Sequence, residues 1–175
     1  MTVIQVLFWL FAACAGGSAL AMVTRRNPVA CAMWLIGTFF SLAAIYTLLG
    51  AFFIGIIQIL VYAGAIMVLF LFVIMLLNLG NDVEADIRGT GWKIMAGGAS
   101  LVMIALLANV FAGGKPLPLG AEAGPAALAA AQAQQGTVGV IATPLYGEFL
   151  VPLQATAMLL LIAVVGAVVL AKRKV

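Results

Sequence analysis

The segment from Ala51 to Leu79 constrains the fold of this chain more than any other feature, because it contains no charged residue. A helix of about 20 apolar residues crosses a hydrocarbon core of about 30 Å. This segment is longer than that, and its middle holds Gln58, Tyr62 and the small-residue run Ala63-Gly64-Ala65. The sequence therefore predicts a membrane helix with a polar and conformationally permissive centre.

Composition extends this prediction to the whole chain. Hydrophobic residues make up 66% of the sequence and charged residues 7%, whereas soluble domains carry about 25% charged residues. These values indicate an integral membrane protein without a sizeable soluble domain. The net charge of +3 does not indicate a nucleic-acid partner, because most basic residues lie close to hydrophobic segments, as orientation signals do. The chain has two cysteines and no histidine, so we expect no haem, iron–sulfur or zinc site in it.

Five hydrophobic segments predict an all-α protein with five transmembrane helices. Only helices and closed barrels satisfy the backbone in lipid, and the alternating pattern of a barrel strand is absent. Asn27-Pro28 is typical of a helix start, and a tight turn near Leu49-Gly50-Ala51 is expected to separate the second and third spans. The predicted spans are approximately 3–23, 29–50, 51–79, 92–112 and 146–171.

The basic residues predict the orientation of these spans. Arg25-Arg26 in the first loop and Lys172-Arg173-Lys174 at the end both favour the cytoplasmic side. An outer N-terminus and a cytoplasmic C-terminus satisfy both signals. Residues 113–145 then form a long connection on the outer face, to which we assign no chemistry. Its Ala-rich part, Pro125 to Gln135, is interpreted either as a short surface helix or as flexible low-complexity loop.

Few polar side chains lie inside the predicted spans. Glu148, at the start of the last one, suits a solvated or helix-capping role, and the scarcity of buried charge argues against an autonomous proton pump. Gln58 and Tyr62 share one helix face, and Gln154 lies in the last span; each either joins neighbouring helices or contacts water. Ala63-Gly64-Ala65 indicates either close helix packing or a weak point where a π-bulge forms. No residue stands out as catalytic.

The third span resembles a known family. The run Val61-Tyr62-Ala63-Gly64-Ala65-Ile66-Met67-Val68-Leu69-Phe70, continued to Leu79, is similar to the third helix of subunit J of bacterial NADH-quinone oxidoreductase. This enzyme is respiratory complex I, and the mitochondrial counterpart of the subunit is subunit 6. Arg26-Asn27-Pro28-Val29 and the ending Ala171-Lys172-Arg173 support the resemblance, which covers nearly the whole chain.

The resemblance implies a non-catalytic subunit of a proton-translocating enzyme in the bacterial inner membrane. It implies no cofactor in this chain, since flavin, iron–sulfur clusters and quinone belong to other subunits. The implied partners are subunits A, H, K and N and membrane lipid, and the 113–145 connection becomes a periplasmic loop. In the family the third helix carries a π-bulge, placed here near Tyr62 to Val68, whose interconversion with α-helix opens or closes a water path.

The same resemblance assigns roles to particular residues. Tyr62 is implied to be a movable polar group and Gly64 the permissive backbone point. Met67, Val68 and Phe70 are implied to rotate between dry and wet arrangements. Glu occurs in family members where this chain has Gln58 and Gln154, and an amide does not titrate, which puts a proton-relay role at these positions in doubt.

The sequence leaves other functions open besides that of a switching subunit. The chain is either such a switching subunit or a structural scaffold between other subunits. A related complex that uses reduced ferredoxin or a deazaflavin as electron donor is a third reading, which this chain cannot decide because it does not contact the donor. An independent small-solute transporter is disfavoured by the lack of membrane charges and of an internal repeat.

Overall fold

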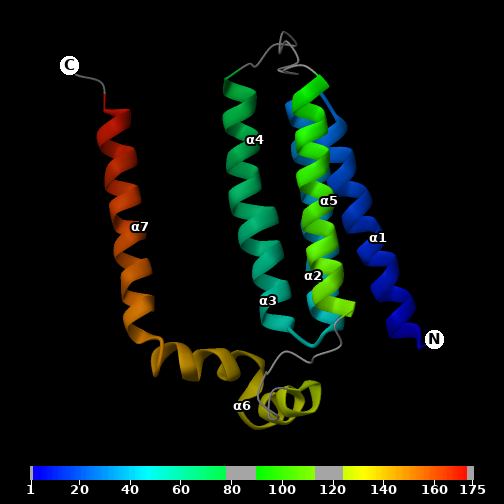
Figure 1. Ribbon diagram of the computed structural model, residues 1–175. Helices are drawn as coiled ribbons and strands as arrows, with labels where there is room; N and C mark the ends of the chain where they lie inside the picture. Colours follow the sequence, from blue (N-terminus) through cyan, green and yellow to red (C-terminus); the bar gives the residue numbers. More distant parts are fainter. Residues whose placement is uncertain (1, 78–89, 113–123, 173–175) are drawn as a thin grey trace. The chain divides into compact units, whose positions relative to one another are not determined.

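The computed structural model describes residues 2–77, 90–112 and 124–172, and every element in these ranges is a helix (Figure 1). The chain forms two compact units, Met1–Ala123 and Gly124–Val175, which are described separately. The all-α prediction is therefore confirmed.

The first unit is built around α2. Helices α1 (Val3–Thr24) and α2 (Pro28–Leu48) are followed by one continuous helix made of α3 (Phe52–Ile57), the π-helix η1 (Gln58–Ile66) and α4 (Met67–Leu76). These three long helices alternate in direction and lie side by side (Figure 1). Helix α2 contacts α1 on one side and α3, η1 and α4 on the other. It is therefore the element against which the third helix is positioned.

Both ends of α2 follow from local sequence chemistry. The Asn27 side chain accepts hydrogen bonds from the backbone N–H groups of Val29, at 2.9 Å, and Ala30, at 3.4 Å. Pro28 occupies the first helical turn, where its missing N–H costs nothing. After the helix ends, Gly50 adopts a φ of 81°, a left-handed conformation that suits glycine. The predicted turn between the second and third spans is confirmed.

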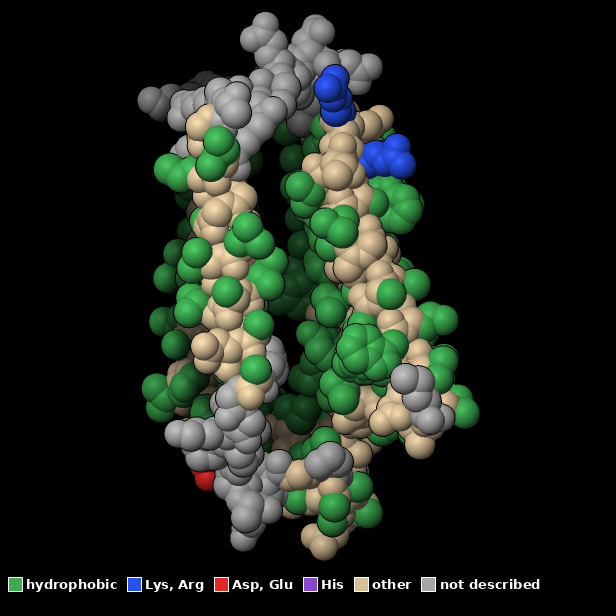
Figure 2. Space-filling view, turned by 45° about the vertical axis from the view of Figure 1, so that its right-hand side comes forward, with side chains coloured by type: hydrophobic (Ala, Val, Ile, Leu, Met, Phe, Trp, Pro, Cys, Tyr) green, Lys and Arg blue, Asp and Glu red, His purple; other side chains and the backbone are tan. Residues whose placement is uncertain are grey.

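The buried core of this unit is small and lies between α2 and α4. Ala32, Met67 and Ile74 are its buried members, and the apolar side chains packed against them are Leu35, Ile36, Phe39 and Leu71. Most other large apolar side chains are exposed, and Figure 2 shows hydrophobic side chains along the length of the helices. Such surfaces suit contact with lipid or other membrane subunits rather than water.

Within the described residues, four helices are long and apolar enough to cross a membrane: Val3–Thr24, Pro28–Leu48, Phe52–Leu76 and Leu150–Ala171. Helix α5 (Thr90–Ala112) occupies the predicted fourth span, and its apolar part, Ile94–Val110, is shorter. The last residues of the predicted third span, 78 and 79, lie outside the described residues. Which side of a membrane each end faces stays a prediction.

The second unit corrects two expectations. Much of the connection predicted as a loop over 113–145 is helical, because α6 runs over Pro125–Tyr146. Alanine-rich sequence favours helix, and Gly136, at a φ of 75°, interrupts it. Of the two readings left open for the Ala-rich part, the helix is correct. The last span, predicted from residue 146, begins later as α7 (Leu150–Ala171), because a turn precedes it in which the Gly147 N–H donates to the Thr143 carbonyl at 3.0 Å.

Removal of the α2 cap is expected to destabilise this helix start. Asn27→Ala leaves two backbone donors without their side-chain acceptor and costs about 1 kcal/mol. Unfolding of the full chain in detergent micelles, followed by circular dichroism, measures the loss. Asn27→Asp retains the acceptor and serves as the control, so equal destabilisation by both variants would contradict a capping role.

Candidate functional site: a π-helical segment in the third helix

The third helix changes its hydrogen-bond pattern in the middle without breaking. At its entry the Gln58 N–H donates to the Ile54 carbonyl, four residues back, as in an α-helix. At its exit the Met67 N–H donates to the carbonyls of Gly64 and Tyr62, the latter five residues back. The residues flanking η1 keep right-handed helical angles, with φ −63° at Ile57 and −71° at Met67. Wide π turns of this kind are rare and occur frequently at functional sites.

Gly64 lies where the π-helical backbone leaves little room for a side chain. A Cβ atom built on Gly64 would lie 3.3 Å from the carbonyl oxygen of Ile59, five residues back. Any larger side chain there requires the wide turn to adjust by a few tenths of an ångström. Glycine avoids that adjustment, which gives a physical reason for its presence in this segment.

The predicted site residues fall into three places. Gln58, Tyr62 and Gly64 lie within η1, whereas Met67, Val68 and Phe70 lie in the following α4. Gln154 lies exposed on α7, in the second unit. The π-helix itself begins earlier than the expected bulge, at Gln58, and ends at Ile66.

Tyr62 contacts α2 through its ring. The ring centroids of Tyr62 and Phe39 are 5.8 Å apart, with an interplanar angle of 65°. This edge-to-face geometry is favourable for aromatic pairs. The Tyr62 side chain is nevertheless 46% exposed, and the neighbouring Gln58 is half-buried. Tyr62 therefore packs against α2 through its ring while nearly half of its side chain is exposed.

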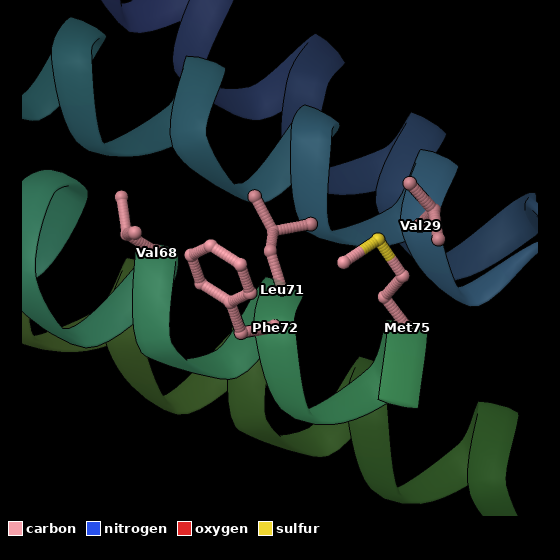
Figure 3. A pocket seen from close by; sticks show the side chains of 5 residues that line it. All are labelled: Val29, Val68, Leu71, Phe72 and Met75. Carbon is pink, nitrogen blue, oxygen red and sulfur yellow. The ribbon is translucent and has the colours of Figure 1, made fainter. Parts of the chain in front are cut away.

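The side chains of the α4 residues next to η1 point in different directions. Met67 is only 3% exposed because it packs toward α2, whereas Val68 and Phe70 are about half exposed at 48% and 50%. Val68 also lines an apolar groove of about 270 Å³ between α4 and the start of α2 (Figure 3). The lining side chains are Val29, Val68, Leu71, Phe72 and Met75.

The distinguishing property of this site is its backbone conformation. Among the described residues no group of three or more His, Cys, Asp or Glu side chains is placed to hold a metal ion. The π segment QILVYAGAI contains no carboxylate, amine or thiol. Its distinguishing feature is the wide backbone hydrogen-bond pattern, seen at its exit in the bond from the Met67 N–H to the Tyr62 carbonyl.

Sequence reasoning missed two residues of the site, Phe39 and Gly55. Phe39, the partner of the Tyr62 ring, lies in a different span, and no local pattern marks it. Gly55 is buried against α2, and the small residue at that position was the only signal that could have indicated the contact.

Comparison with known proteins identifies the family of this sequence. Residues 18–170, which include the whole of the third helix, match the family described as NADH-ubiquinone/plastoquinone oxidoreductase chain 6. The chain belongs to this family. Its resemblance to subunit J is thereby confirmed, and as a chain 6 family member it is a membrane subunit of the NADH-quinone oxidoreductase complex.

Two of three relatives match nearly the full sequence, and the third matches about half of it. NADH-quinone oxidoreductase subunit J of Rhodobacter capsulatus is 38% identical over 99% of this chain and 84% of its own length. NAD(P)H-quinone oxidoreductase chain 6 of Leptolyngbya boryana is 36% identical over 97% of this chain and 80% of its own. Subunit J of Escherichia coli K12 is 40% identical over 54% of this chain and 52% of its own.

Proposed function

We propose that this subunit couples quinone reduction to proton translocation by interconversion of the π-helix with regular α-helix. The observation that supports the proposal is the π segment Gln58–Ile66 inside a continuous, uncharged helix long enough to span a membrane. The proposed subunit holds no cofactor and does no bond chemistry. It changes the surface that it presents to a water path formed with other subunits.

The proposed setting is the bacterial inner membrane. In this proposal the chain crosses the membrane five times, with the N-terminus outside, the C-terminus in the cytoplasm and the 113–145 connection on the periplasmic side. Arg25 and Arg26 before α2 and Lys172 after α7 support this orientation, because basic residues are retained on the cytoplasmic side. The proposed neighbours are the membrane subunits A, H, K and N, with lipid over the remaining apolar surface. The electron donor is proposed to be NADH, as in the name of the Rhodobacter capsulatus relative.

The physics of the segment suits a switch of small energy. In the wide turn an N–H bonds the carbonyl five residues back, and in the α-form the carbonyl four residues back, so nearly every hydrogen bond is exchanged rather than lost. When the wide turn converts to a regular α-helical turn, the turn holds one residue fewer. The rest of the helix then rotates by about 100° and shifts by about 1.5 Å. Apolar side chains then leave the path or enter it, which changes whether water occupies it. Gln58 remains uncharged in either form.

Tyr62→Phe tests the polar role of Tyr62 directly. The substitution retains the ring that contacts Phe39 and removes only the hydroxyl. We expect NADH-driven proton uptake by membrane vesicles to fall several-fold per electron pair, with the complex assembled in normal amount. Tyr46→Phe, in α2, is the matched control. Wild-type pumping by Tyr62→Phe would contradict a movable polar group at this position.

A scaffold function is the second candidate, favoured by the many exposed apolar side chains of α1 and α7. It predicts the same third-helix hydrogen-bond pattern in every state of the enzyme. Structures of the whole complex at rest and during turnover separate the two functions. A π-helix that is unchanged in both states would favour the scaffold.

A further inference from the structure

We infer that the apolar groove between α4 and the start of α2 binds one acyl chain of an anionic phospholipid, whose phosphate is held by Arg25 and Arg26. The occupant is therefore a single lipid with a negatively charged headgroup. Such a site does not depend on the switching function, because it requires only that the helices cross a lipid bilayer.

The groove runs along one face of α4. Four of its lining side chains come from α4 at spacings of one helical turn, and one comes from the first turn of α2: Val68, Leu71, Phe72, Met75 and Val29 (Figure 3). From Val68 to Met75 the helix rises about 10 Å. Leu71 packs against the buried cluster, and the other four side chains are between 45% and 61% exposed. The groove is therefore elongated, open and lined by apolar side chains, which suits a hydrocarbon chain.

One end of the groove lies next to two basic residues. Figure 3 shows Val29 and Met75 at one end and Val68 at the other, because α2 begins beside the end of α4. Arg25 and Arg26 precede Val29 by four and three residues, and both are exposed. The apolar groove and the two positive charges therefore adjoin at the same end of the helices, as the chain and the headgroup of a lipid do.

The backbone of Arg25 is fixed on both sides. Its N–H donates to the Ala21 carbonyl at 3.2 Å, and its carbonyl accepts a hydrogen bond from the Cys31 thiol, also at 3.2 Å. The first N–H groups of α2 are already bonded to Asn27. The binding chemistry at this end of the groove is therefore supplied by guanidinium groups on a fixed turn and not by the helix N-terminus.

The charge of the two arginines fits a phosphate. Among the described residues of the first unit, 2–77 and 90–112, there is no Asp or Glu to neutralise them. Asp82, Glu84 and Asp86 lie outside the described residues. A guanidinium group binds phosphate oxygens through two parallel hydrogen bonds. Basic pockets between membrane helices bind anionic lipid headgroups, so an anionic lipid matches both parts of this surface.

Photocrosslinking in the whole complex tests this lipid site. Phe72 is replaced by the photoreactive residue p-benzoylphenylalanine, and the complex is placed in nanodiscs with equal amounts of phosphatidylglycerol and phosphatidylcholine. Mass spectrometry of the irradiated subunit identifies the adducts formed at position 72. Phe70 is the matched control position, because it is an exposed phenylalanine of the same helix that does not line the groove.

We expect position 72 to favour phosphatidylglycerol over phosphatidylcholine by about thirtyfold, since each basic side chain near an anionic headgroup contributes about fivefold. Position 70 should show no such preference. Arg25→Gln and Arg26→Gln, made singly, should each lower the preference at position 72 to about fivefold. Lys172→Gln removes an exposed charge of the second unit and should leave the preference unchanged.

Val29→Phe tests the groove without altering either arginine. The larger side chain fills the groove from α2, so the yield of every lipid adduct at position 72 should fall several-fold. Met33→Phe is the control, because Met33 lies one turn further along α2, is 57% exposed and does not line the groove. An unchanged yield with Val29→Phe would contradict an acyl chain in the groove.

Several outcomes would overturn the lipid site. Equal yields of the two lipid adducts, or a preference that survives loss of either arginine, would show that the arginines do not select the headgroup. A preference that also falls with Lys172→Gln would indicate general surface charge instead of a site. An adduct with a peptide of another subunit would show protein in the groove, and no adduct at all would show that the groove is closed. The π-helix is untouched by each of these outcomes, so the switching function is tested separately.

Discussion

Gly64→Val is expected to abolish most proton pumping by the complex while the complex still assembles. A Cβ at position 64 already lies 3.3 Å from the Ile59 carbonyl oxygen, and valine adds a branched side chain with little rotamer freedom in a helix. The wide turn is therefore disfavoured relative to the α-form by about 1–3 kcal/mol, the usual cost of local strain. That corresponds to a shift in population of about fivefold to about a hundredfold, since about 1.4 kcal/mol is a factor of ten.

Quinone reductase rate and proton uptake in the same membrane vesicles measure this effect. NADH oxidation by an artificial acceptor reports the amount of assembled enzyme. Gly17→Val is the matched control, because a Cβ at Gly17 of α1 has nothing within 4 Å. Wild-type rate and pumping with Gly64→Val would show that the switching hypothesis is wrong.

Met67→Ala is expected to shift the same equilibrium from the other side. Met67 is 3% exposed, and truncation of a buried methionine to alanine costs about 2–5 kcal/mol in a packed core. Under the proposed function this loss applies only to the form in which Met67 faces α2. The α-form is then populated more, and pumping falls through loss of the π-form.

Cryo-electron microscopy of the purified Met67→Ala complex measures the share of particles that contain the π-helix. Proton pumping by the same variant is measured alongside. Met67→Leu retains most of the volume and should behave nearly as wild type. Met33→Ala, at a side chain of α2 that is 57% exposed, controls for loss of a methionine. A scaffold predicts lower stability of the complex with an unchanged third helix, and that outcome would contradict the switch.

Much of the fold was predictable because lipid imposes simple requirements on sequence. The uncharged runs predicted the spans, and Asn27-Pro28 and Gly50 predicted the start of α2 and the turn after it. These signals are local: they depend on hydropathy, on a cap and on one backbone angle. The loop over 113–145 was wrong in part for a related reason, since alanine-rich sequence fits both loop and helix until its surroundings choose.

The site was predictable only through resemblance. Residues alone left Ala63-Gly64-Ala65 consistent with close packing and with a π turn. Similarity to the family favoured the π turn, and the match to the family covers the whole third helix. The switching roles of Tyr62 and Val68 remain predictions, because a single conformation does not test a change between two.

By itself, the sequence determined that this chain is helical, belongs in a membrane and contains a permissive centre in its third span. Only the tertiary structure decided that the wide turn runs from Gln58 to Ile66, that Met67 faces α2 and that Gly55 lies close against α2. Hydropathy is a property of each residue, whereas a helix register depends on which neighbouring helix each face meets. That contact brings together spans that are separate in the sequence, so no local pattern contains it.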